Sequence, residues 1–373
     1  MSKRAIVSVI NDLATDQRVR KVCDSLTEMG FDILLVGRKL RNSPRMDKRP
    51  YGVKRMRLLF HRGPLFYAEY QFRLLVLLLF QTNVSLLIAN DLDTLFPNYL
   101  VSKIKRCPLV YDSHEYFTGV PELQAHPMKQ KIWKAIESAI FPKLKSVITV
   151  NHSIAQLYHQ EYGLRPVVVR NVSPRLRVTV RKTREELGLP TGKKILIMQG
   201  SGINVQRGAE EMVEAMQWVE NAILLLVGGG DVVETLKRMV DERGVSHKVM
   251  FKGRMPYPEL MQYTRNADLG LSLDKPLSIN YRLSLPNKLF DYLNAGIPVL
   301  ASPLVEVKKI IEQYQVGDFI PNHQPKMMAD KINEIFLHDD WLVKWRANAK
   351  KAAEELNWEN ESTILKKVYQ QYV

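Results

Sequence analysis

A predicted helix in the last third of the chain carries the residues with the clearest chemical signature. Ser284 can cap this helix and Gly296 can end it, so Lys288 falls in its first turn. A cation in that turn opposes the helix dipole by about 0.3 to 1 kcal/mol unless an anion such as phosphate binds there. Asp291 follows Lys288 by three residues and Asn287 by four, so it shares their face and can accept hydrogen bonds from ribose hydroxyls. The pattern predicts a nucleotide site, with a surface ion pair between Lys288 and Asp291 as the alternative.

A glycine loop earlier in the chain has a similar chemical character. The apolar run 194–198 is followed by Gly200 and Gly202 and then by a helical pattern that starts at Ala209. Backbone N–H groups in such a loop can approach an anion closely, and Arg207 offers a forked donor for phosphate. The loop matches neither the G-x-G-x-x-G fingerprint nor a P-loop. A glycine-lined turn without a ligand therefore remains the alternative.

Polar residues in the first half of the chain also follow predicted strands. Asp91 and His114 each come just after an apolar run. An imidazole there can bind a sugar hydroxyl and manage its proton near neutral pH, although a structural histidine is the alternative. Asp16 and Arg18 open the first predicted crossover helix. Arg18 either meets an anionic acceptor or lies on a solvated helix face.

The elements that must position these residues alternate between strand and helix patterns. The apolar, β-rich runs are 5–9, 33–36, 84–89, 109–111 and 147–150, and then 195–198, 223–227, 249–251, 269–273 and 298–301. This alternation predicts an α/β chain with two doubly wound, Rossmann-like parallel-sheet domains facing across a cleft. In such sheets ligands bind beyond the carboxyl ends of the strands, where all the residues above fall.

The chain length of 373 residues suits two domains. A polar, proline-bearing linker around residue 175 separates a domain at 1–175 from a domain at 176–357. The remaining segment, 358–373, has apolar residues at helical spacing, and we expect it to pack outside the second domain, with the first domain as one place for it. The run 72–80 is much shorter than the roughly 20 apolar residues of a membrane span, and it predicts a buried crossover helix, with a helix that dips into a membrane as the alternative.

Charge is concentrated in the first domain. Residues 1–175 hold 27 Lys and Arg against 14 Asp and Glu, and so carry +13 of the net charge of +15. This excess favours an anionic partner such as a phospholipid surface or a phosphate-bearing substrate, with surplus surface lysine as the alternative. Cys23 and Cys107 form neither a disulfide framework nor a metal motif, and the apolar start is too short for a signal peptide. We therefore expect a cytoplasmic protein, either free or peripheral on the inner face of the membrane.

Five segments of the chain carry a resemblance to a known family. They are Asn11–Arg20, Ala89–Asp93, Tyr111–Glu115, Val168–Val172 and Leu285–Ser302. In these segments the chain resembles the retaining glycosyltransferases of family 4, which have the two-domain GT-B fold. The resemblance implies that 1–175 is the acceptor-side domain and that 176–357 binds a nucleotide-diphosphate sugar as donor.

The resemblance also implies roles for donor-side residues. Arg207 and Lys288 would grip the diphosphate, next to the loop glycines and Asn287. The second acid of the family's Glu-x7-Glu motif corresponds to Asp291, whereas the first would fall at Leu283, so the acid that usually orients the donor sugar is missing. Two further donor contacts are implied, at Glu306 after the next strand and at Asn171 in the hinge.

On the acceptor side, His114 resembles the family's histidine, with Asp16, Arg18 and Asp91 nearby. The implied reaction is retaining transfer of a hexose to a hydroxyl of a glycan or lipid-linked acceptor, in polysaccharide or glycolipid synthesis. We expect neither a cofactor nor a metal, because Asp91-Leu-Asp93 lies in the wrong domain to hold a diphosphate. Two alternatives remain: a sugar-nucleotide 2-epimerase of the same architecture, and a non-catalytic protein that binds a membrane or nucleic acid. No nucleic-acid motif supports nucleic acid as a partner.

Overall fold

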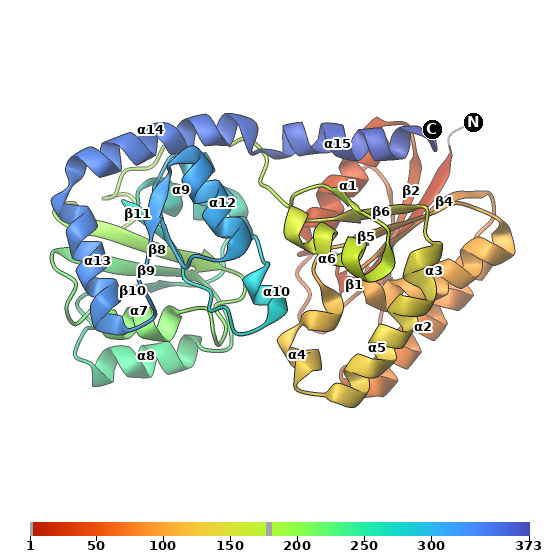
Figure 1. Ribbon diagram of the computed structural model, residues 1–373, viewed down its shortest axis with the longest axis horizontal. Helices are drawn as coiled ribbons and strands as arrows, with labels where there is room; N and C mark the ends of the chain where they lie inside the picture. Colours follow the sequence, from red (N-terminus) through yellow and green to blue (C-terminus); the bar gives the residue numbers. More distant parts are fainter. Residues whose placement is uncertain (1–2, 177–180) are drawn as a thin grey trace. The chain divides into compact units, whose positions relative to one another are not determined.

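The computed structural model describes residues 3–176 and 181–373, so Met1, Ser2 and part of the expected linker lie outside the described residues. The chain forms two compact units. Unit 1 comprises Met1–Asn171 and Glu361–Val373, and unit 2 comprises Val172–Asn360. Each unit contains one sheet of parallel strands with helices packed on it (Figure 1).

Unit 1 is built on a seven-stranded sheet with the order β3-β2-β1-β4-β5-β6-β7. Its strands are β1 (Arg4–Asp12), β2 (Asp32–Arg38), β3 (Gly52–Met56), β4 (Val84–Asn90), β5 (Leu109–Ser113), β6 (Ser146–Thr149) and β7 (Val167–Val168). Every neighbouring pair is parallel. The central strands are covered on both faces, which explains why their sequences are nearly continuous apolar runs rather than alternating ones.

Helices cover both faces of this sheet, with α2, α3 and α5 on one face and α1 and α15 on the other (Figure 1). The helices of unit 1 are α1 (Gln17–Glu28), α2 (Gly63–Phe80), α3 (Leu92–Lys105), α4 (Pro121–Gln124), α5 (Pro127–Ile140), α6 (His152–Tyr162) and the short 3₁₀ turns η1 (Phe117–Gly119) and η2 (Phe141–Lys143). The run 72–80 is helical as expected, but Phe72 and Phe80 are exposed. The prediction of a buried helix holds only for one stripe of α2, which contacts the core.

Unit 2 is built on a six-stranded parallel sheet with the order β10-β9-β8-β11-β12-β13. Its strands are β8 (Lys194–Gly200), β9 (Ala222–Gly228), β10 (Val249–Lys252), β11 (Leu269–Ser272), β12 (Val299–Ala301) and β13 (Gly317–Phe319). The prediction of two doubly wound parallel sheets is therefore confirmed.

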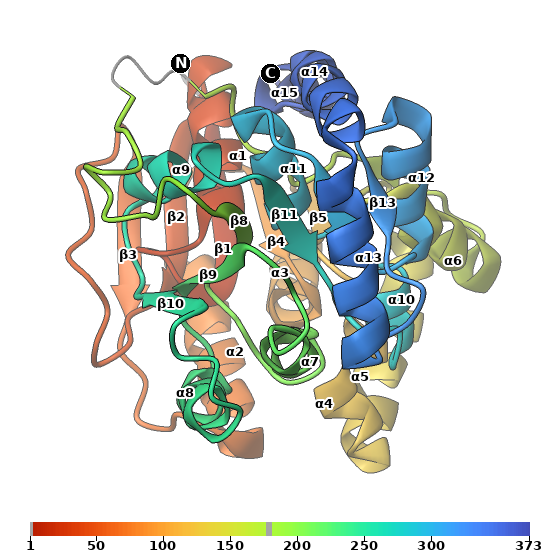
Figure 2. The same ribbon diagram turned by 90° about the vertical axis from the view of Figure 1, so that its left-hand side faces the viewer.

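The helices of unit 2 also form two layers. Figure 2 shows α7 and α8 on one face of the sheet and α9 and α11 on the other. The helices are α7 (Ala209–Ala215), α8 (Val233–Glu242), α9 (Tyr257–Arg265), α10 (Ile279–Arg282), α11 (Asn287–Ala295), α12 (Val305–Tyr314), α13 (Pro325–Leu337) and α14 (Asp339–Glu355). The last helix, α15 (Trp358–Gln370), begins in unit 2 and has most of its length in unit 1. Over the described ranges 3–176 and 181–373, no helix has both the length and the apolar character needed to cross a membrane.

Candidate active site

The sheet of unit 2 reverses its direction of growth between β8 and β11. The chain adds β9 and β10 on one side of β8, and then β11, β12 and β13 on the other side. The loops after β8 and β11 therefore diverge, and ligands of open α/β sheets bind at such a switch point beyond the carboxyl ends of the strands. Gly200 ends β8, and Asp274 lies two residues beyond the end of β11.

Three charged side chains meet beyond these two strand ends. Nη1 of Arg207 lies 3.1 Å from Oδ1 of Asp274, and Nζ of Lys288 lies 3.2 Å from Oδ2 of the same carboxylate. The guanidinium of Arg207 also lies over the ring of Tyr281, 5.3 Å from its centroid. The structure thus brings together the two cations that the sequence analysis selected, and Asp274 is the group that holds them.

This cluster is largely buried and has one surplus positive charge. Asp274 is 1% exposed, while the side chains of Lys288 and Arg207 are 10% and 31% exposed. Burial lowers the pKa of the Lys288 ammonium, and the neighbouring Arg207 also lowers it, while Asp274 raises it. Any anion that binds here meets cations whose water has already been partly removed, so the attraction is stronger than on an open surface.

Two glycines let the backbone close around the cluster. Gly208 precedes α7 with a φ of 75°, and a Cβ at this position would lie 2.5 Å from the backbone oxygen of Leu273. Gly228 ends β9 with a φ of 130°, and a Cβ there would lie 1.8 Å from the backbone oxygen of Gly200. Any other residue would push the loops after β8, β9 and β11 apart.

Arg254 is a further cation beside this loop, and no sequence motif marked it. Its Nη2 donates a hydrogen bond to the backbone oxygen of Ser201 at 3.0 Å. A Cβ on Gly229 would lie 2.7 Å from its Nε, so the guanidinium rests directly on the backbone there. Gly202 is half-buried in the same loop.

Asp291 has different neighbours from those we predicted. Its carboxylate accepts hydrogen bonds from the hydroxyls of Ser173 and Tyr257 and from Nε2 of Gln199, the last at 3.0 Å. The side chain is buried, and no ion pair between Asp291 and Lys288 occurs among the described residues. The structure thus gives Asp291 a structural role, and its predicted contact with a donor ribose stays a prediction. Protein donors occupy both of its oxygens, and it ties the 173 segment to α11.

The start of α11 also differs from the prediction. Ser284 does not cap this helix, because its hydroxyl donates to the backbone oxygen of Tyr281 instead. Pro286 is the residue before the helix, and no side chain of the described residues caps it. Asn287, the first helical residue, is exposed. The first turn therefore presents backbone N–H groups together with Lys288, as an anion site requires.

The two other donor-side positions lie at helix ends. Glu306 is 5% exposed in the first turn of α12, where its carboxylate pairs with Lys309 at 2.7 Å. Leu283 follows α10 and is half-buried.

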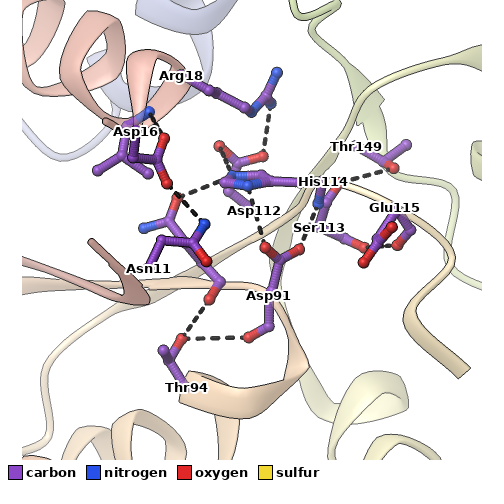
Figure 3. Close-up of polar contacts among 12 residues, drawn as sticks. Asn11, Asp16, Arg18, Asp91, Thr94, Asp112, Ser113, His114, Glu115 and Thr149 are labelled. Atoms are coloured by element: carbon purple, nitrogen blue, oxygen red, sulfur yellow. Dashed lines mark hydrogen bonds and ion pairs between the residues drawn. The ribbon is translucent and has the colours of Figure 1, made fainter. Parts of the chain in front are cut away.

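Unit 1 has its own switch point, between β1 and β4. Asp91 follows β4 directly and His114 follows β5. Asp16 caps α1, which follows β1, and accepts hydrogen bonds from the backbone N–H of Val19 and from Nδ2 of Asn11. Figure 3 shows Asp91 and Asp112 beside the imidazole of His114, and Asp16 bonded to Asn11.

His114 lies between two carboxylates. Its Nδ1 is 3.1 Å from Oδ2 of Asp91, and its backbone N–H donates to Oδ1 of the same residue at 2.8 Å. Its Nε2 is 3.1 Å from Oδ1 of Asn90 and 3.6 Å from Oδ2 of Asp112 (Figure 3). Burial opposes protonation of the ring, but the two carboxylates outweigh it and raise the pKa of His114 to about 10. The two carboxylates therefore favour the imidazolium form of the ring, in which both nitrogens donate, and the exchange of its proton near neutral pH stays a prediction.

The backbone at Asp91 is strained. Its φ is 60° and its ψ is 166°, a region that residues other than glycine rarely occupy, at a cost of about 1 to 3 kcal/mol. The conformation is held by a hydrogen bond from the Asp91 N–H to the backbone oxygen of Asp112 and by the contact with His114. Such strain accumulates where a side chain must be aimed for function.

Arg18 is buried rather than exposed on a helix face. Its side chain is 3% exposed, and Nη2 lies 2.7 Å from Oδ1 of Asp112, while Nη1 donates to the backbone oxygen of Val169. This ion pair holds the pKa of Asp112 well below its usual range. The alternative of a solvated helix face was therefore wrong for Arg18, because packing of α1 turns the guanidinium inward, and its contact with an anionic acceptor stays a prediction.

Asn171 is the last residue of the first segment of unit 1, and its Oδ1 accepts a hydrogen bond from Nζ of Lys21 at 3.0 Å.

The sequence analysis missed two carboxylates of the site. Asp274 is a single acid shortly after β11, and Asp112 lies within β5. The only sequence signal for these two residues was an acid in or beside an otherwise apolar run, which indicates a buried carboxylate with a partner. Over the described part of the chain, no group of three or more His, Cys, Asp or Glu could hold a metal ion.

Comparison with known proteins identifies the family. The family model described as Glycosyltransferase Family 4 matches residues 16–172, and the model described as Glycosyl transferases group 1 matches residues 179–355. The chain is 26% identical to the uncharacterized glycosyltransferase MJ1607 of Methanocaldococcus jannaschii over 50% of this chain and 47% of that protein, so it spans about half the length of that relative. It is 21% identical to the D-inositol 3-phosphate glycosyltransferase of Corynebacterium glutamicum over 73% of this chain and 68% of that protein.

Solved structures show the same architecture. The sucrose-phosphate synthase of Thermosynechococcus elongatus superposes with a TM-score of 0.77 at 18% identity, covering 99% of this chain and 98% of that one. HepE of Anabaena, solved in complex with UDP-glucose, superposes with a TM-score of 0.73 at 15% identity, covering 99% and 98%. The two family models, which between them match residues 16–172 and 179–355, show that the chain belongs to the glycosyltransferases of the family 4 type, and the shared architecture shows that it has the GT-B fold.

Proposed function

We propose that this protein is a retaining glycosyltransferase that moves a hexose from a nucleotide-diphosphate sugar to a hydroxyl of a glycan or lipid-linked acceptor. The observation that carries the proposal is the convergence of Arg207 and Lys288 on Asp274 at the switch point of unit 2. Two partly buried cations beside an uncapped helix start suit a diphosphate better than any neutral ligand. We therefore assign the donor to unit 2 and the acceptor to unit 1.

The donor diphosphate would lie against Arg207, Lys288 and the first turn of α11. In the transition state the bond between the anomeric carbon and the phosphate oxygen breaks, and negative charge develops on that oxygen. Fixed cations stabilise this charge without having to reorganise. Such electrostatic stabilisation is the largest contribution to the rate enhancement of many enzymes. These cations take the role that a divalent metal has elsewhere, so we propose that the reaction needs no metal.

The acceptor hydroxyl oxygen would form its bond to the anomeric carbon on the face that the diphosphate leaves. Its proton passes to the departing phosphate oxygen, so the step needs no protein base and retains the configuration. His114 would then hold a sugar hydroxyl as a hydrogen-bond donor, which agrees with its position between the carboxylates of Asp91 and Asp112. The remaining proposed donor contacts are Gly200, Gly202, Asn171, Asn287, Asp291 and Glu306, and the remaining proposed acceptor contacts are Asp16, Arg18 and Asp91.

A thermal-shift screen with a panel of nucleotide-diphosphate sugars tests this function. A donor that binds the folded state raises the melting temperature by mass action, and HepE, which is solved with UDP-glucose, makes that compound the first probe. A donor that stabilises the protein is then incubated with and without acceptor. Transfer that requires an acceptor supports the proposal, whereas an epimerised sugar without acceptor would establish the rival 2-epimerase. Failure of every sugar nucleotide to bind, together with salt-sensitive binding of RNA or DNA, would overturn both.

We also propose that unit 1 works on an anionic membrane surface at the cytoplasmic face. Exposed large apolar residues are concentrated in and before α2; they are Leu59, Phe60, Leu65, Phe72, Leu79 and Phe80. Lys54, Arg57 and Arg62 lie in the same stretch, and none of the three has an ion-pair partner among the described residues. Apolar side chains flanked by cations are typical of segments that rest on anionic lipid. A lipid-linked acceptor in glycolipid or polysaccharide synthesis would fit this location.

A further inference from the structure

A second cationic site lies at the opposite end of the unit 1 sheet. A pocket of about 480 Å³ opens where α3 ends, where β5 and β6 begin, and beside the carboxyl end of α15. Among its lining residues are Lys103, Arg106, Lys143, Lys145, Tyr99 and Tyr372. All of them belong to unit 1.

The charge of this pocket is one-sided. Four of its lining residues are Lys or Arg, and none is Asp or Glu. Within residues 3–176 and 181–373, none of these four cations takes part in an ion pair, although Lys103 lies over the ring of Tyr99. Lys105, by contrast, faces away from the lining and donates to the backbone oxygens of Leu79 and Gln81.

The helix dipole of α3 accounts for only part of this charge. A lysine in the last turn offsets the partial negative charge of the helix end, which explains Lys103. Arg106, however, lies beyond that turn with a φ of 53°, and Lys143 and Lys145 come from the segment between α5 and β6. Like charges around one cavity repel one another, and an anion that binds between them relieves this repulsion.

We propose that this pocket binds a ligand with two or more phosphate groups. Arg106 supplies a forked donor and the three lysines supply mobile point charges, which together suit adjacent phosphates rather than a planar carboxylate. The volume suits a small organic molecule rather than a single phosphate ion. The phosphates come either from a soluble oligophosphate or from a lipid headgroup.

This pocket is separate from the candidate active site. It lies at the amino end of β5, which starts at Leu109, whereas His114 follows the carboxyl end of the same strand. Five strand residues at about 3.3 Å each span about 16 Å. A ligand in the pocket therefore leaves the acceptor side open, and the inference does not depend on the proposed glycosyltransferase reaction.

Cys107 provides a direct measurement, because it lines the pocket and is half-exposed while Cys23 is buried. We expect sodium tripolyphosphate to slow the labelling of Cys107 by a maleimide and to raise the melting temperature. The double variant Lys143→Gln/Lys145→Gln should weaken this protection about tenfold, because half of the pocket's charge is lost. The matched control Lys129→Gln/Lys131→Gln removes two exposed cations from α5 and should bind normally.

A further variant separates this pocket from the donor site. Arg207→Gln should leave the protection of Cys107 intact, because Arg207 lies in unit 2. Loss of protection in Arg207→Gln, equal loss in the control and the pocket variant, or no protection in the wild type would each overturn the proposal. Vesicles of phosphatidylcholine with a bisphosphorylated phosphoinositide form a second arm. Protection by vesicles and by tripolyphosphate identifies a lipid headgroup, and protection by tripolyphosphate alone identifies a soluble ligand.

Discussion

Nζ of Lys288 lies 3.2 Å from Oδ2 of Asp274, and this carboxylate is the only acid that approaches the ammonium among the ion pairs of the described residues. Its other oxygen is held by Arg207. The carboxylate therefore has two effects: it keeps a buried ammonium charged, and it aims two repelling cations at one point. Removing it would leave those cations unbalanced in a largely buried environment.

The first prediction concerns Asp274→Asn. We expect this change to lower the free energy of unfolding by about 3 kcal/mol, because it leaves Lys288 and Arg207 facing each other with a neutral amide between them. Urea unfolding measures the change. Asp339→Asn is the matched control, since it removes the acid of an exposed pair with Lys194 and should cost less than about 1 kcal/mol. Equal losses in the two variants would contradict the role given to Asp274.

The second prediction concerns Lys288→Gln. The variant should lower kcat about 100-fold or more, because one of the cations that stabilise the leaving diphosphate is gone. The thermal shift caused by the donor should shrink in parallel. Lys308→Gln, which removes an exposed cation from α12, should retain normal turnover. A variant Lys288→Gln with wild-type kcat would show that the diphosphate binds elsewhere.

The third prediction concerns pH. In the folded state the pKa of His114 is about 10, whereas an unfolded histidine has a pKa of about 6.5. The folded protein therefore holds this proton more tightly, and the resulting stability is fully present below pH 6.5 and is lost as the pH rises towards 10. The difference in unfolding free energy between wild type and His114→Gln should shrink by a few kcal/mol between pH 6.5 and pH 10.

Asp91→Asn sharpens this test, because it keeps an oxygen for the His114 N–H but removes one of the two carboxylates that raise the pKa of the ring. The imidazole resonances in NMR spectra should then titrate at a lower pH than in the wild type. A His114 pKa near 6.5 in the wild type would refute the imidazolium assignment.

The fourth prediction concerns the membrane surface. The variant Phe72→Ser/Phe80→Ser should reduce cosedimentation with anionic vesicles about tenfold or more, because two exposed rings no longer enter the lipid. Leu337→Ser removes an equally exposed apolar side chain from unit 2 and should bind as the wild type does. Equal binding to anionic and neutral vesicles would reject the role of the surrounding cations.

Long apolar runs made the central strands predictable. Strands such as β1, β4, β8 and β9 are covered on both faces, so their sequences have few other ways to fold. The short edge strands β3 and β13 were missed, because Gly52–Met56 contains two cations and Gly317–Phe319 has only three residues. Edge strands receive much of their pairing from neighbours that the local sequence does not indicate.

The sequence by itself determined the two doubly wound sheets, the strand ends after which polar residues fall, and the selection of Arg207, Lys288 and His114. Tertiary structure alone decided which partners the buried carboxylates have. Asp274 lies between two cations, Asp112 pairs with Arg18 across a separation of 94 residues, and Asp291 accepts hydrogen bonds from hydroxyl and amide donors. The physical reason is the distance along the chain between the residues that determine each feature. Strand and helix patterns arise from neighbours along the chain, whereas the charge state and direction of a buried side chain depend on which distant elements pack against it.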